Sequence, residues 1–143
     1  MRTKGFTVVE LLIVIVVIAI LAAIVTVAYT GVQQKARDSV RSTDIANVQR
    51  AIEMYYADNA VYPQISGGVD NTGYALSSLA PLLVPQYIRA LPNDPNTKLT
   101  TYQYVRGTGG NAYGIRISYE ARTPCHKGMY NTGLGWWGLQ ACT

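Results

Sequence analysis

The stretch that decides the fold reads KGFTVVELLIVIVVIAILAAIV and covers residues 4–25. It joins a short basic start, with Arg2 and Lys4, to an unbroken apolar run over residues 11–25. The wider apolar stretch from Phe6 to Tyr29 is long enough to span a bilayer, which takes about 20 residues. It is also long for the apolar core of a signal peptide. The stretch therefore predicts a membrane-spanning helix at the start of the chain.

A single acidic residue, Glu10, interrupts this apolar stretch. A carboxylate in hydrocarbon is costly unless it has a partner, and such residues are usually functional. No basic residue lies between positions 5 and 34, and Lys4 reaches Glu10 only across the membrane boundary. A cleaved signal peptide or a plain signal anchor leaves the glutamate unexplained. Cleavage between Gly5 and Phe6 supplies a partner, because the new α-amine of Phe6 can neutralise Glu10 of a neighbouring copy.

Residues KGFTVVELL, followed by the apolar helix, resemble the prepilin signal of type IV pilins and type II secretion pseudopilins. The resemblance implies that a prepilin peptidase and methyltransferase removes residues 1–5 as a leader, cuts after Gly5 and methylates Phe6. It further implies that Glu10 acts with Phe6 in assembly. The expected partners are the membrane, a pilus assembly platform and further copies of the same subunit in a homopolymer.

The basic leader also predicts the orientation of the chain. Arg2 and Lys4 should stay in the cytoplasm by the positive-inside rule, which places the C-terminal part outside. The expected localisation is a single-pass membrane protein before assembly and an extracellular filament afterwards. Cys125 and Cys142 are the only two cysteines, and outside the cytoplasm such a pair is expected to form a disulfide bond.

The apolar segment, residues 6–30, is expected to continue as one helix into a head that covers residues 31–143. No proline occurs between Met1 and Tyr62, so a helix can run from Phe6 to about Asn59, roughly 80 Å at the usual rise per residue. Apolar residues then recur at helical spacing and predict a face toward a core: Ile45, Val48, Ile52 and Tyr55. The charged residues of the opposite side, three apart in Asp38/Arg41, Arg41/Asp44 and Arg50/Glu53, suit a ladder of surface salt bridges, with contacts between subunits as the alternative.

The head is expected to be small and of mixed α+β class. Pro63 cannot continue the helix, and residues 75–88, interrupted by two prolines, suggest a short helical turn. Residues 101–106 and 112–119 alternate as strands do, and the glycine-rich residues 107–111 between them predict a hairpin loop. The predicted fold is a long N-terminal helix packed on a small antiparallel sheet.

Nothing in the sequence assembles a catalytic site, so we expect no enzyme activity, no cofactor and no metal site. The only histidine, His126, is expected to be a solvated polar residue beside Lys127. The glycine-rich loop at 107–111 joins two strands, which does not fit a phosphate-binding loop. The net charge is +4, of which the leader supplies half, and the remaining basic residues show no nucleic-acid footprint.

Two further stretches, Tyr55 to Pro63 and LPNDP at residues 91–95, resemble the major pseudopilin of type II secretion, so that the likeness covers the chain to about residue 119. In that pseudopilin, acidic residues near the C-terminus bind calcium, whereas here none follows Glu120. The Cys125–Cys142 loop instead resembles the disulfide-closed loop of pilus-forming pilins.

We therefore expect a major pilin of a type IV pilus, serving adhesion, motility or DNA uptake. The first alternative is a pseudopilin of type II secretion or a minor pilin. The second is a membrane-anchored adhesin that does not polymerise and whose loop, with Trp136 and Trp137, binds a ligand. The sequence does not identify a surface ligand.

Overall fold

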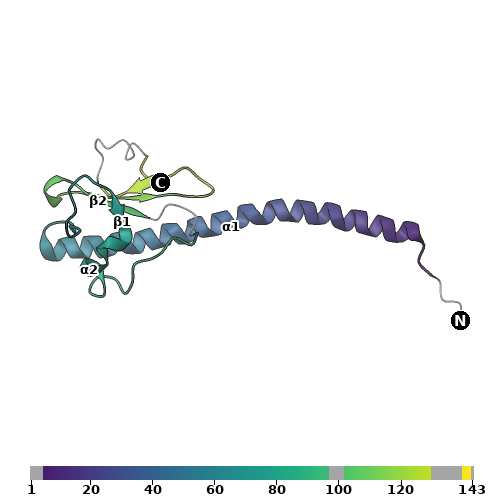
Figure 1. Cartoon of the computed structure of the whole chain (residues 1–143), viewed down its shortest axis with the longest axis horizontal. Coiled ribbons are helices and arrows are strands. Elements are labelled where there is room, and N and C mark those ends of the chain that lie inside the picture. Colours follow the sequence, from purple (N-terminus) through teal and green to yellow (C-terminus); the bar gives the residue numbers. More distant parts are fainter. Residues whose placement is uncertain (1–4, 97–101, 130–139, 143) are drawn as a thin grey trace.

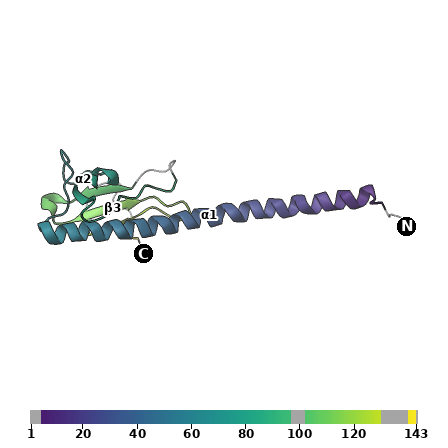
Figure 2. The same cartoon turned by 90° about the horizontal axis from the view of Figure 1, so that it is seen from below.

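One long helix carries a small head on its C-terminal half. The computed structural model describes residues 5–96, 102–129 and 140–142. Helix α1 (Val8–Asn59) contains 52 residues and is continuous through Gly31. Its N-terminal half stands free of the head, and its C-terminal half lies along one side of it (Figure 1, Figure 2). The predicted long helix is confirmed, with a start two residues later than expected.

The head contains one sheet of four antiparallel strands. These are β1 (Tyr74–Ala75), β2 (Gln103–Arg106), β3 (Tyr113–Ile117) and β4 (Cys125–Lys127), in the order β1-β2-β3-β4. Strands β2 and β3 are the two that the alternating pattern predicted, and a 3₁₀ turn (Thr108–Gly110) lies between them. The sequence did not reveal β1 and β4, because two or three residues are too few to show an alternating pattern. The α+β class is confirmed.

The core lies between α1 and the inner face of the sheet. The predicted apolar face of α1 is buried, and Tyr113, Ile115 and Ile117 of β3 all point toward it. A 3₁₀ turn (Leu76–Leu79) and the short helix α2 (Ala80–Leu83) close one edge with three buried leucines. The fully buried apolar residues of this core include Val48, Ile52, Leu79, Leu83, Val105, Ile115 and Ile117.

Helix α1 ends where the sequence predicted a stop. Ala60 takes a left-handed conformation with φ of 58°, and its N–H donates to the carbonyl of Tyr56 at 2.8 Å. The carboxylate of Glu53, one turn before Tyr56, accepts hydrogen bonds from the hydroxyls of Tyr62 and Tyr113 at 3.2 and 2.9 Å. Both tyrosine rings are buried, and this carboxylate satisfies their hydroxyls. The return of the chain after the helix is therefore anchored back onto α1.

Candidate assembly site

The N-terminal half of α1 is an apolar rod, and no other described part of the chain packs against it. Helix α1 is long and apolar enough to cross a membrane, and none of its most apolar 18-residue window is buried within the chain. Phe6 is 81% exposed, and the apolar side chains that follow it as far as Val25 are all exposed. Exposed apolar surface on this scale marks a site for membrane or protein contact. The segment thus requires lipid, or the helices of other subunits, around it.

The predicted cleavage point lies in the extended segment just before α1. A side chain added at Gly5 would meet no atom within 4 Å. The fold therefore places no steric demand on Gly5, and a need for glycine there would have to come from a processing enzyme. The pairing of Gly5 and Phe6 as a cleavage and methylation site stays a prediction.

Glu10 forms a capping box with Thr7 at the start of α1. Its Oε2 atom accepts from the backbone N–H of Thr7 at 2.7 Å and from the Thr7 hydroxyl at 2.8 Å. In return, the N–H of Glu10 donates to the Thr7 hydroxyl oxygen at 3.3 Å. This reciprocal arrangement satisfies free N–H groups at the helix start. The expected role of Glu10 in assembly is untested, but the carboxylate has a local partner that the sequence argument missed.

The signal for Thr7 was present in the sequence. A threonine followed three residues later by a glutamate, ahead of an apolar run, is the pattern of a capping box. Thr7 is a neutral partner for Glu10, whereas the sequence had been interpreted in terms of a charged partner. Because Thr7 directly follows Phe6, the capping box holds the Glu10 carboxylate against the residue next to the predicted new N-terminus.

A buried charged centre fastens the head to α1 at the end of the head nearest the apolar rod. The side chain of Arg41 is 0% exposed, and its guanidinium donates to three carboxylates. Two bonds, of 2.9 and 2.7 Å, reach Asp94, and one each reaches Asp38 at 2.6 Å and Glu120 at 2.8 Å. Arg37 adds two more bonds to Glu120, at 2.8 and 2.6 Å. This charged centre, Arg37, Arg41, Asp38, Asp94 and Glu120, joins the helix to two loops of the head.

The contacts within the charged centre favour the ionised state of its two arginines, of Asp38 and of Glu120. Hydrogen bonds from Arg37 lower the pKa of Glu120 to about 2. Burial alone would raise the pKa of Asp38, but the N–H groups of Glu120 and Ala121, together with Arg41, lower it overall. Hydrogen bonds to Asp94 raise the pKa of Arg41 above its usual value. These four groups therefore stay charged at neutral pH, and charge-assisted hydrogen bonds compensate their charges.

The prediction of a surface salt-bridge ladder on α1 is wrong. Arg41 and Asp38 are buried beneath the head. Asp44 accepts a hydrogen bond from Tyr102, Glu53 binds tyrosine hydroxyls, and Arg50 donates to Asn47 at 3.1 Å. Among the described residues, helical spacing identified one correct pair, Asp38/Arg41, whereas the other partners of Arg41 lie up to 79 residues away in the sequence.

The C-terminal segment is held to the sheet by the predicted disulfide. Cys125 and Cys142 are bonded, with their Cα atoms 5.1 Å apart. Beside the bond, the Nζ atom of Lys127 donates to the carbonyl of Cys142 at 2.9 Å, and His126 pairs with Ala141. The prediction that His126 is solvated is wrong, because it is a buried residue of β4. Trp136 and Trp137 lie outside the described residues.

The acidic residues of the chain do not offer a calcium cage. All eight acidic residues lie in the described ranges, and each carboxylate accepts a hydrogen bond from another group of the chain. Within those ranges, no group of three or more acidic, histidine or cysteine side chains could hold a metal ion. Among the described residues, the donor set therefore does not fit a calcium site such as that of the pseudopilin which the sequence resembles.

Comparison with known proteins places the chain in a family. Residues 1–26 match the model "Prokaryotic N-terminal methylation motif", and residues 28–121 match "Type II secretion system (T2SS), protein G". A type II secretion system core protein G of Vibrio cholerae is 34% identical over 97% of this chain and 94% of its own length. Proteins of the same name from Pseudomonas aeruginosa (34% identical, 76% of this chain and 78% of the relative) and Escherichia coli K12 (35%, 66% and 67%) are also similar. No solved structure matches the chain significantly.

These matches correct the expectation of a pilus-forming major pilin. The relatives carry the name of a secretion component, and they support the first alternative, a pseudopilin. The family match extends through the head to residue 121 and outweighs the missing acidic residues and the disulfide, which favoured a pilin. Both halves of the chain, the methylation motif and the head, lead to one conclusion: it belongs to the type II secretion system protein G family.

Proposed function

We propose that the chain is a pseudopilin, a structural subunit without enzyme activity that polymerises through the N-terminal half of α1 in a type II secretion system. The observation that carries this proposal is the free apolar rod with Glu10 at its start. A head that folds by itself leaves this rod uncovered, so its surface is available for packing against the same rod of other copies. The subunits wait as single-pass membrane proteins with their heads outside the cytoplasm, and a prepilin peptidase processes them first.

Glu10 sets the stagger of the subunits in this proposal. Packing of apolar helices has little positional preference, whereas a charge pair in an apolar medium is satisfied in only one register. The N–H and hydroxyl of Thr7 hold the carboxylate in place at the helix start. The α-amine of Phe6 from an adjacent copy then forms the charge pair with this carboxylate.

Substitution of Glu10 tests assembly separately from folding. Glu10→Ala should insert into the membrane and fold, but should form far fewer filaments or cross-linked multimers in cells that express the secretion system. Asp58→Ala is the matched control and should assemble normally, because it removes an exposed carboxylate near the end of α1 that, among the described residues, accepts a hydrogen bond only from Tyr87. Normal multimers from Glu10→Ala would contradict the assembly role.

The mass of the native subunit tests processing. We expect a chain that begins at Phe6 and carries one added methyl group. A subunit recovered with Met1 still in place, and as a single protomer, would contradict both processing and polymerisation. Gly5→Leu should block cleavage, and the uncut chain should accumulate in the membrane.

A type IV pilus subunit remains the second candidate, because the disulfide-closed C-terminal segment resembles that of pilus-forming pilins. Deletion of the gene separates the two functions. Loss of protein export with surface filaments unchanged supports the pseudopilin, and loss of sheared surface filaments with export unchanged supports the pilin.

A further inference from the structure

The end of the head that faces the membrane combines neutralised carboxylates with free cations. The three acidic residues there, Asp38, Asp94 and Glu120, all belong to the charged centre, and their side chains are at most 10% exposed. Lys35 and Arg122 lie beside this centre and are exposed. Among the described residues, no carboxylate forms an ion pair with either of them. The accessible charge on this end is therefore positive.

The two cations line one open groove. The groove has a volume of about 440 Å³ and lies between α1 and the turn after Glu120. Arg122 uses one N–H to donate to the Ser42 hydroxyl at 2.6 Å, and its guanidinium lies 3.7 Å from the centre of the Tyr119 ring. These contacts fix its position and leave further N–H donors available. The residues that line the groove are Lys35, Asp38, Ser39, Ser42, Ala121 and Arg122.

The groove lies close to where α1 leaves the membrane. Lys35 follows Tyr29, the last residue of the apolar stretch, by six positions, which is about 9 Å along a helix. A lysine side chain can bridge most of such a distance by extending toward the lipid headgroups. The same helix fixes both the apolar rod in the bilayer and the groove above it. The groove is therefore held next to the headgroup layer whenever the subunit is in the membrane.

We propose that this groove binds the headgroup of an anionic phospholipid in the leaflet on the side of the head. Lys35 and Arg122 contact the phosphate, and the hydroxyls of Ser39 and Ser42 supply neutral donors. The carboxylate of Asp38 also borders the groove, but two backbone N–H groups and Arg41 already bind it. The lipid anchors the lower end of the head while the subunit waits, and it is released when the subunit leaves the bilayer. This inference does not depend on what the subunit polymerises into.

Spin-labelled lipids test the proposal on the full chain. The chain is reconstituted in vesicles of phosphatidylcholine with one part in five phosphatidylglycerol. Electron paramagnetic resonance then measures how strongly each labelled lipid is immobilised by the protein. We expect immobilisation of phosphatidylglycerol over phosphatidylcholine by roughly threefold, falling toward one in Lys35→Gln/Arg122→Gln and in 0.5 M salt. Arg2 and Lys4 contribute equally to every variant, so the difference between variants is the result that counts.

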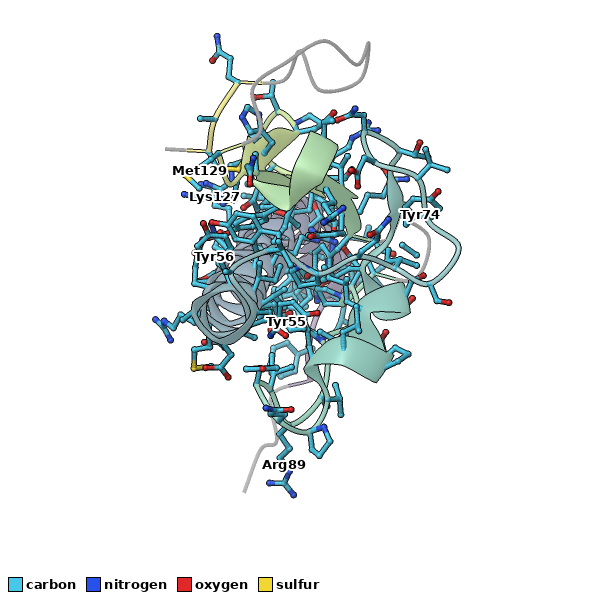
Figure 3. All side chains as sticks on the ribbon, turned by 90° about the vertical axis from the view of Figure 1, so that its left-hand side faces the viewer. Tyr55, Tyr56, Tyr74, Arg89, Lys127 and Met129 are labelled. Atoms are coloured by element: carbon cyan, nitrogen blue, oxygen red, sulfur yellow. A yellow bond between two sulfur atoms is a disulfide. The ribbon has the colours of Figure 1, made fainter. Side chains whose placement is uncertain are left out.

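Arg89→Gln is the matched control, because Arg89 is exposed and projects away from the rest of the head (Figure 3). This variant should keep the full preference. Equal immobilisation of both lipids by the native chain would overturn the proposal, as would a preference that survives in the double variant. Saturable binding of inorganic phosphate to the chain in neutral detergent micelles, followed by NMR, would also overturn it, because it would indicate a site for free phosphate. Lys35→Gln alone, which should lower the preference in part, provides a test if the double variant folds poorly.

Discussion

Replacement of Arg41 by methionine should loosen the whole head. Methionine keeps much of the volume of the side chain but removes all four hydrogen bonds to Asp38, Asp94 and Glu120. Three carboxylates then remain at a site where their side chains are 3–10% exposed. Removal of one partner from a buried ion pair typically costs about 3–5 kcal/mol, because the remaining charge is left uncompensated. We expect Arg41→Met to lower the free energy of unfolding by about this amount at pH 7.

The pH dependence gives this prediction a second signature. In the native chain the pKa of Glu120 is lowered to about 2 from an ordinary value of 4.5. A lowered pKa contributes stability above the unfolded value, and this contribution is lost as the pH falls from about 4.5 toward 2. In the variant, Arg37 still binds Glu120 and two backbone N–H groups still bind Asp38, but the positive charge of Arg41 no longer balances the three carboxylates. Protonation lowers this excess negative charge, so acidification destabilises the variant less than the native chain. The difference in unfolding free energy between the two chains should therefore narrow as the pH falls from 7 to 4.

Urea unfolding of the detergent-solubilised chain, followed by near-ultraviolet circular dichroism of the buried tyrosines, measures both effects. Arg50→Met is the control, because Arg50 is exposed on the same helix and bonds only to Asn47 among the described residues. It should change the unfolding free energy by less than about 0.5 kcal/mol. A loss below about 1 kcal/mol for Arg41→Met, or a difference that stays constant between pH 7 and 4, would refute the assignment of Arg41 as the centre of this contact.

Three further predictions concern the disulfide, a glycine and the capping box. Replacement of both Cys125 and Cys142 by serine should cost about 3 kcal/mol of stability through the unfolded state, and a native chain treated with reductant should melt at the same lowered temperature as this variant. Gly128→Ala should destabilise the head in a thermal melt, because φ is +106° there and the added Cβ would clash with a carbonyl of β3. Gly67→Ala, at a φ of +72° where the added Cβ would meet no atom within 4 Å, introduces no clash and should be milder. Thr7→Val should slow assembly in a cross-linking assay without changing membrane insertion, because Glu10 loses its hydroxyl donor, and Thr7→Ser should restore the native rate.

The parts of the fold that depend on local pattern were predictable from sequence. The absence of proline before Pro63 and the spacing of Ile45, Val48 and Ile52 predicted a long helix with one buried face, and both are present. Alternation around Ile115 and Ile117 predicted the strand that forms the centre of the core. These features depend on a period that is visible within a few residues of the sequence.

Contacts between distant segments were not predictable in the same way. Arg41 has an apparent partner three positions away in Asp38, but Asp94 and Glu120, its other partners, lie 53 and 79 residues further on. No period in the sequence brings these residues together. The burial of His126 likewise depends on its place in a three-residue strand at the sheet edge. The capping box of Thr7 and Glu10 was missed for a different reason. Its pattern is visible in the sequence, but only charged partners of Glu10 were considered.

The continuity of α1 has a mechanical consequence. The same unbroken helix forms the rod in the bilayer and the inner wall of the head, so no flexible joint between them can absorb a displacement. The charged centre binds the helix at the end of the head nearest the apolar rod. Through these contacts, an axial force on the head is transferred to the rod. An axial displacement of the N-terminal end of α1 is therefore expected to move the head by a similar distance. In the proposed assembly, the subunit therefore transmits an axial force along one continuous helix, from the apolar rod to the far end of the head.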